Sequence, residues 1–91
     1  MESTLKIKVN HPAGLHARPA SLFVQTASKF TSNIQVQNLT NESNIANAKS
    51  ILSVLTLGVV QNHEIEISAD GEDAESATKA LELLISDDFG E

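Results

Sequence analysis

The sequence predicts an α+β fold, an open-faced β-sandwich in which three helices cover one face of a four-stranded sheet, antiparallel or mixed, in the order βαββαβα. Several short segments alternate apolar and polar residues, as strands with one face in water do. Two longer segments repeat their apolar residues at helical spacing. Because cleanly alternating strands belong to antiparallel or mixed sheets, we expect the helices to cover the other face of the sheet.

The first half of the chain supplies two strands and the first helix. Residues 5–9 alternate apolar residues with lysines and predict a strand, whereas the proline and glycine within residues 10–15 predict a loop. From residue 17 to about residue 30 the period is that of a helix, and residues 34–37 predict the second strand. The apolar face of this helix would hold Ala20, Phe23, Val24 and Ala27.

The middle of the chain is polar and then apolar. Residues 38–44 are rich in Asn, Thr and Ser and predict a turn, and residues 44–48 predict a short third strand. A short helix follows over residues 50–57, with Ser50 as its N-cap and Gly58 just past its end.

The last part of the chain supplies a strand, a turn and a helix. Residues 64–68 alternate strictly, and residues 70–73 form an acidic turn before the helix, where the helix dipole favours acids. The apolar stripe of this helix would hold Ala74, Ala77, Leu81 and Leu84, widened by Ala80 and Ile85. Residues 86–91 are interpreted as a polar, frayed tail.

The composition indicates one acidic domain, residues 1–91, because this length has room for a single core. Twelve acids against six bases give a net charge of −6, which disfavours contact with nucleic acids and anionic lipids. The only aromatic residues are three phenylalanines, so no platform for stacking bases is present. We expect no nucleic-acid partner, whereas a protein with a basic or apolar docking face remains open.

The chain has no cysteine, which excludes disulfides and thiolate metal sites. No apolar run is long enough to span a membrane, and the N-terminus lacks the order of a secretory signal. We therefore expect a cytoplasmic protein, in which the sequons at Asn38 and Asn41 are ordinary turn residues. His11 and His63 are interpreted as solvated surface residues and not as metal ligands.

The segment Gly14-Leu15-His16-Ala17-Arg18-Pro19-Ala20 places a histidine at the predicted start of a helix. Unpaired amides and the positive end of the helix dipole suit a phosphate there, and an imidazole can act as a nucleophile. His16 is therefore interpreted as a histidine that carries phosphate, held by the amides of Ala17 and Arg18 and by the Arg18 guanidinium. Pro19 suits the first turn, where a missing N–H does no harm.

The residues alone also allow a second interpretation, in which His16 only begins the helix on an exposed loop. Phosphoryl transfer between two proteins needs positioning and charge neutralisation from the protein. We therefore expect no metal and no cofactor on this chain.

Two motifs in register resemble the histidine-containing phosphocarrier (HPr) family of the phosphoenolpyruvate-dependent sugar phosphotransferase system. The first is the segment from Gly14 to Ala20, and the second is Ala48-Lys49-Ser50-Ile51-Leu52, continuing to Leu57-Gly58. A strand ending near Ser68-Ala69 and a glycine turn before the last helix also fit the family. The likeness extends from about residue 5 to residue 85. The family's fold is an open-faced β-sandwich of four antiparallel strands and three helices, which agrees with the order of elements above and implies an antiparallel sheet.

The resemblance implies a role for each matching residue. His16 would be phosphorylated on Nδ1 by Enzyme I and would pass the phosphoryl group to sugar-specific Enzyme IIA components. Arg18 would contact the phosphate, and Pro19 would shape the first turn. The chain would then be a stoichiometric phosphoryl-transfer intermediate, not a stand-alone enzyme, and a monomer would suit this shuttle.

Ser50 and the apolar residues around the second predicted helix each have a structural and a functional interpretation. Ser50 would cap the second helix, or would also be a regulatory phosphorylation site for a kinase whose product acts with a catabolite repressor. Apolar residues around this helix would either pack inward or form a docking patch beside His16. The residues of this patch would be Leu22, Ile51, Leu52 and Leu55.

Two other functions remain open. A regulatory relative, such as the nitrogen-branch phosphocarrier, would keep the histidine but signal mainly through protein contacts; the segment at residues 49–52 favours the sugar branch. A pure interaction module would carry no phosphate, and the intact His16 and Arg18 argue against it.

Overall fold

The computed structural model describes residues 1–91, with four strands and three helices. Their order confirms the predicted βαββαβα arrangement. The strands are β1 (Glu2–Lys8), β2 (Asn33–Asn38), β3 (Ala46–Asn47) and β4 (Glu64–Asp70). The helices are α1 (Ala17–Ala27), α2 (Ile51–Leu55) and α3 (Ala74–Ser86), followed by the 3₁₀ turn η1 (Asp88–Gly90).

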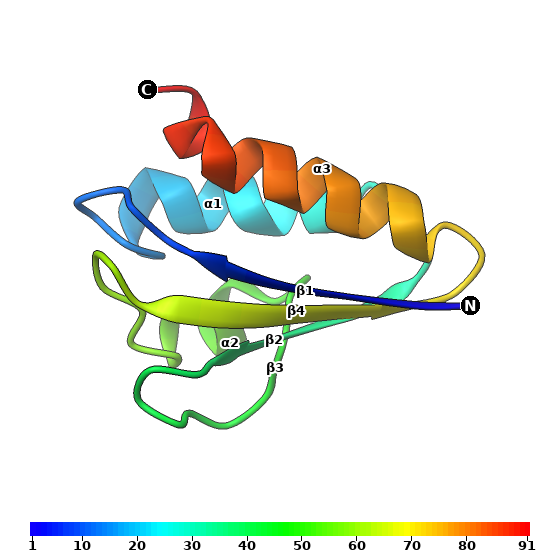
Figure 1. Ribbon diagram of the computed structural model, residues 1–91, viewed down its shortest axis with the longest axis horizontal. Helices are drawn as coiled ribbons and strands as arrows, with labels where there is room; N and C mark the ends of the chain where they lie inside the picture. Colours follow the sequence, from blue (N-terminus) through cyan, green and yellow to red (C-terminus); the bar gives the residue numbers. More distant parts are fainter.

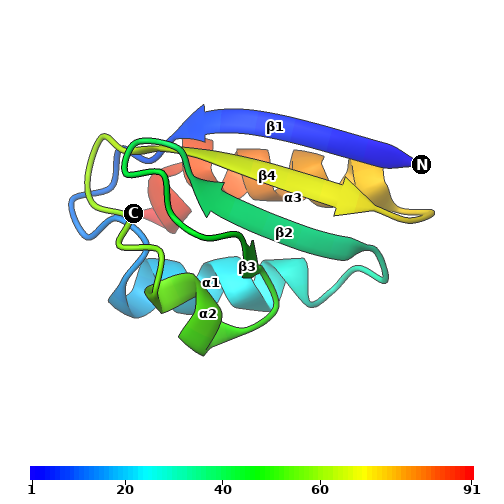
Figure 2. The same ribbon diagram turned by 90° about the horizontal axis from the view of Figure 1, so that it is seen from below.

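The four strands form one antiparallel sheet in the order β1-β4-β2-β3. In its centre Ile67 of β4 is paired with Leu5 of β1 on one side and with Val36 of β2 on the other. Figure 1 shows α1 and α3 lying together over one face of the sheet. The short helix α2 lies beside α1, near the edge of the sheet that β3 forms (Figure 2). The predicted open-faced β-sandwich is confirmed.

The alternating pattern of the strands produces the core. Every second residue of β2 and β4 is buried, because these two strands lie inside the sheet and turn one face toward the helices. In the edge strand β1 the inward residues are only half-buried. The sheet contributes Ile34, Val36, Ile65, Ile67 and Ala69 to the core, and the two long helices contribute Ala20, Phe23, Ala27, Ala74, Ala77, Leu81 and Ile85.

The element boundaries differ from those predicted at several ends. Strand β1 begins at Glu2 and not at residue 5, because its pairing with β4 continues to Glu2 opposite Asp70. Helix α1 ends at Ala27 because the next turn tightens, with the amide of Phe30 donating to the carbonyl of Ala27 at 3.2 Å. Helix α2 ends at Leu55 for the same reason. Strand β3 is only two residues long.

The interpretation of Asn38 as a turn residue is wrong. Asn38 is the last residue of β2 and is fully buried. Its side-chain amide donates to the carbonyl of Leu57 at 3.2 Å and lies 3.0 Å from Nδ1 of His63, while its Oδ1 accepts from the amide of Thr40. A polar side chain is stable inside the fold because it has these partners.

The interpretation of residues 86–91 as a frayed tail is also wrong. Helix α3 runs to Ser86, and Phe89 is only 2% exposed and belongs to the core. Two consecutive residues, Asp88 and Phe89, have left-handed backbones (φ of 49° and 57°), which turn the tail back onto the protein. One large aromatic side chain anchors an otherwise polar segment. No helix of the structure is both long and apolar enough to cross a membrane.

Candidate functional site

The loop between β1 and α1 is tied to the loop before β4. The backbone of Gly14 is left-handed, with φ of 60°, and a Cβ on this residue would lie 2.2 Å from the carbonyl oxygen of Val59. Only glycine therefore fits at this position. The next residue, Leu15, is fully buried and its amide donates to the same carbonyl at 3.1 Å. These contacts determine the backbone path into His16.

His16 stands directly before α1 as its N-cap, with an extended backbone (φ −131°, ψ 166°). Its carbonyl accepts the first bond of the helix, from the amide of Ala20 at 3.4 Å. The ring is half-buried and makes no capping hydrogen bond. The imidazole of His16 is therefore partly accessible and does not cap the helix.

The first turn of α1 presents two unpaired amides. Neither Ala17 nor Arg18 has a backbone hydrogen-bond partner for its N–H, and Pro19 has no N–H to satisfy. Ala17 is left-handed, with φ of 51°, and the Arg18 side chain is exposed. Two unpaired amides thus directly follow the half-buried His16 in the chain, together with an exposed arginine, and this is an arrangement suited to an anion.

Ser50 is the N-cap of α2, as predicted. Its Oγ accepts from the amide of Ser53 at 3.3 Å, and its carbonyl accepts from the amide of Val54 at 3.0 Å. Ser50 as a whole is half-buried.

Helix α2 turns most of its apolar residues to solvent. Val54 is buried, but Leu52 is 75% exposed. Ile51 and Leu55 are also exposed, and these three residues are called the α2 apolar surface below. Leu22 of α1 is half-buried and packs against the core. The interpretation that all of these residues pack inward is wrong.

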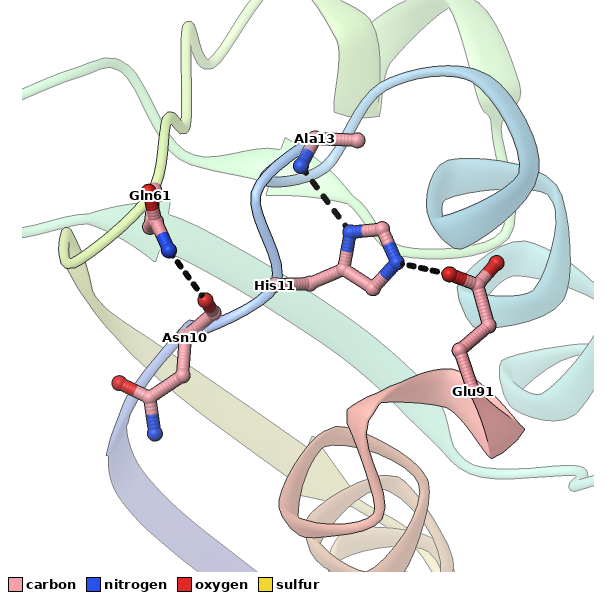
Figure 3. Close-up of polar contacts among 5 residues, drawn as sticks. All are labelled: Asn10, His11, Ala13, Gln61 and Glu91. Carbon is pink, nitrogen blue, oxygen red and sulfur yellow. Dashed lines mark hydrogen bonds and ion pairs between the residues drawn. The ribbon is translucent and has the colours of Figure 1, made fainter.

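The interpretation of His11 as a solvated residue is also wrong, since His11 is buried. Its Nε2 lies 2.6 Å from a carboxylate oxygen of Glu91, at the other end of the chain (Figure 3). His63 is half-buried, and its Nδ1 accepts from the Asn38 side chain and from the amide of Val60. The contacts of His11 with Glu91 and of His63 with Asn38 join segments far apart in the sequence, so no local pattern could have indicated them. No group of three or more His, Asp or Glu side chains is placed to hold a metal ion.

A family model described as "PTS HPr component phosphorylation site" matches residues 3–87. The chain belongs to the HPr family. The match includes the His16 loop, the N-terminus of α1 and the whole of α2. The unpaired amides beside His16 thus lie within the residues that this family model matches.

Individual HPr relatives agree with the family match. The crystal structure of HPr-C-His from Thermoanaerobacter tengcongensis is 48% identical, with a TM-score of 0.93 over 98% of this chain and 97% of that one. The phosphocarrier protein HPr of Buchnera aphidicola is 42% identical over 90% of this chain and 93% of its own length. The multiphosphoryl transfer protein of Vibrio cholerae is 46% identical over 98% of this chain, but this chain spans only 22% of that protein.

Proposed function

We propose that this chain is a phosphocarrier of the phosphotransferase system, acting as one domain over residues 1–91. His16 accepts a phosphoryl group from phospho-Enzyme I and passes it to sugar-specific Enzyme IIA components. The observation that carries this proposal is the free imidazole of His16 beside the unpaired amides of Ala17 and Arg18, within the segment that matches the HPr family.

The transfer needs little beyond positioning. A lone pair on the neutral His16 ring attacks phosphorus, a P–N bond forms on His16, and the bond from phosphorus to the group that carries it on phospho-Enzyme I breaks. The amides of Ala17 and Arg18 then hold the phosphoryl oxygens, and the Arg18 guanidinium adds charge-assisted hydrogen bonds. Because these amides have no internal partner, they need not break a hydrogen bond to do so.

Protein partners would dock on the α2 apolar surface and on Leu22. The exposed side chains of Ile51, Leu52 and Leu55 support this assignment, since a clustered apolar surface commonly marks a partner site. Ser50, at the start of the same helix, is the proposed regulatory phosphorylation site. A phosphate there would place about two negative charges beside the docking residues and weaken docking.

The test is phosphorylation by purified Enzyme I and phosphoenolpyruvate. We expect one phosphate that is labile in acid and stable in base, and we expect His16→Ala to abolish it. His63→Gln serves as the matched control because it alters a histidine outside the loop before α1. Equal labelling of the His16→Ala variant would refute the assignment.

Transfer onward separates the sugar carrier from a regulatory relative. The phosphorylated chain is mixed with a sugar-specific Enzyme IIA, and the phosphate on each protein is measured over time. If the phosphate label leaves His16 and appears on Enzyme IIA, the result supports the sugar-carrier function. A label that stays on His16 would favour a regulatory role through protein contacts.

A further inference from the structure

The C-terminal tail covers the ring of His11, as Figure 3 shows for Glu91. The His11 side chain is only 9% exposed, and its Nε2 lies 2.6 Å from Oε2 of Glu91. The ring of Phe89 packs against it edge-on, with centroids 5.8 Å apart and an interplanar angle of 85°. The tail lies at the same end of the molecule as the loop after β1 (Figure 2). These contacts of Phe89 and Glu91 with His11 are called the C-terminal clasp.

The hydrogen bonds of the clasp determine where the His11 proton lies. The amide of Ala13 donates to Nδ1 of His11 at 3.0 Å, so Nδ1 must offer a lone pair. In a neutral ring the proton is then on Nε2, which donates it to the carboxylate of Glu91. By accepting from Nε2, the Glu91 carboxylate favours the Nε2–H tautomer of His11, whose Nδ1 can accept from the amide of Ala13.

His11 also anchors the turn that leads to His16. The carbonyl of His11 accepts from the amide of Gly14 at 2.9 Å, so His11 holds two successive amides of the turn. Gly14 lies against the backbone of Val59, and His16 follows two residues later. On the other side of His11, the carbonyl of Asn10 accepts from the side chain of Gln61 at 3.0 Å. The loop has little freedom to absorb a displacement of His11 before His16.

We propose that Glu91 is a positioning residue for phosphoryl transfer, which it affects through His11 and the turn from Ala13 to Gly14. This inference rests on the proposed function of His16. Phe89 and Glu91 contribute differently. Phe89 is buried and supplies packing, whereas the Glu91 side chain is 49% exposed and supplies the acceptor that orients the ring.

The experiment compares Glu91→Ala, Glu91→Gln and the wild-type chain, each with phospho-Enzyme I as donor. Glu91→Ala removes the acceptor, and we expect the rate of phosphorylation to fall about tenfold, because small errors in positioning reduce transfer rates strongly. Glu91→Gln keeps a side-chain oxygen that accepts from Nε2, so we expect it to retain most of the rate. Asp87→Ala is the matched control, since it removes a negative charge from the same tail without touching His11.

Nitrogen-15 NMR of the histidine rings supplies a readout that a change in stability alone would not move. In the wild type and in Glu91→Gln we expect the Nε2–H tautomer of His11. In Glu91→Ala we expect loss of that signature and shifted signals for the Ala13 amide and the His16 ring. A Glu91→Ala variant with wild-type rate and unshifted signals would overturn the proposal, and so would a Glu91→Gln variant as slow as Glu91→Ala.

The two proposals fail in different ways. If Enzyme I does not phosphorylate the wild-type chain, the carrier function fails, but the NMR comparison still tests the clasp. Signals of His16 that respond to Glu91→Ala and recover in Glu91→Gln would support the positioning role in that case. If the wild type is phosphorylated and Glu91→Ala changes neither rate nor signals, only the clasp is refuted.

Discussion

At the scale of single residues, the backbone of Ala17 is the most unusual feature of the site. A left-handed conformation costs a residue with a Cβ about 1–2 kcal/mol, and Ala17 adopts it with φ of 51° between His16 and Arg18. Such conformations persist only where the surrounding structure imposes them. Here the anchored loop on one side and the helix on the other impose it, and the unpaired amides lie at the same place.

Arg18 provides the first test at this scale. Its side chain is exposed, so Arg18→Ala should leave the free energy of unfolding within about 0.5 kcal/mol of the wild type. We expect the rate of phosphoryl transfer to fall by about tenfold or more, because a charge-assisted hydrogen bond to the phosphate is lost. Transfer from phospho-Enzyme I and thermal melting measure the two effects. Arg18→Lys keeps the positive charge but lacks the planar guanidinium, so its rate of phosphoryl transfer should lie between those of the wild type and Arg18→Ala.

A large fall in melting temperature for Arg18→Ala would contradict this prediction. It would mean that the side chain supports the fold, and a slower transfer could then not be assigned to lost phosphate contacts.

At the scale of elements, the short helix α2 combines a stabilising cap with a proposed regulatory site. Ser50→Ala removes the bond from Oγ to the amide of Ser53 and should destabilise the protein by about 1 kcal/mol. Ser50→Asp keeps a hydrogen-bond acceptor at the N-cap. Its melting temperature should be close to that of the wild type, since acidic side chains stabilise helix N-termini. We expect its phosphorylation by Enzyme I to slow severalfold, because a charge is placed beside the α2 apolar surface. An Asp variant with wild-type transfer would refute regulation by charge at Ser50.

A second element boundary lies between β4 and α3, where Asp73 is the N-cap of α3. Its carboxylate accepts hydrogen bonds from the amides and hydroxyls of Thr31 and Ser32, and so joins the α1–β2 loop to α3. The Ser32 hydroxyl, followed by the amide of Thr31, lowers the pKa of Asp73 to about 2 from a usual 3.8. These bonds favour the charged carboxylate.

The lowered pKa predicts how stability changes in acid. Since the folded state holds the charged form, the contribution of Asp73 is complete above the usual pKa of 3.8 and is lost as the pH falls through about 2. Asp73→Asn should be less stable than the wild type at neutral pH, and this difference should shrink across that window. Urea unfolding at several pH values between about 5 and 2 measures it. A difference that does not change with pH would contradict the role of the charge.

At the scale of the whole molecule, periodicity was enough to predict the elements and their two layers, and the family resemblance added the antiparallel pairing of all four strands. The alternation that contains Ile34, Val36, Ile65 and Ile67 predicted two of the four strands, and these residues are buried as a set. The spacing of Ala20 and Phe23 identified the face of α1 that covers the sheet. The site itself was found from one local segment, because His16, Ala17 and Arg18 are consecutive and need no long-range contact to come together.

Contacts between distant segments could not be predicted in this way. His11 and Glu91 lie 80 residues apart, and neither has a periodic pattern around it that indicates burial. Asn38 reads as a polar turn residue until the carbonyl of Leu57 and the ring of His63 supply its partners. Polar residues that become buried through tertiary hydrogen bonds carry no signal in a local pattern.

The buried tail leads to the last prediction, which concerns global stability. Phe89 is 2% exposed and contacts the ring of His11, so the tail closes the molecule by packing onto the loop after β1. Phe89→Ala should therefore cost about 3–5 kcal/mol and lower the melting temperature by more than about 10 °C. Leu83→Ala is the matched control, because Leu83 is nearby in sequence, also apolar and 58% exposed, and it should change stability by less than about 0.5 kcal/mol. If the tail were frayed, the two variants would unfold at the same urea concentration. If Phe89→Ala alone unfolds at a lower urea concentration, in a single cooperative transition, the last residues of α3 and η1 belong to the same folding unit as the sheet.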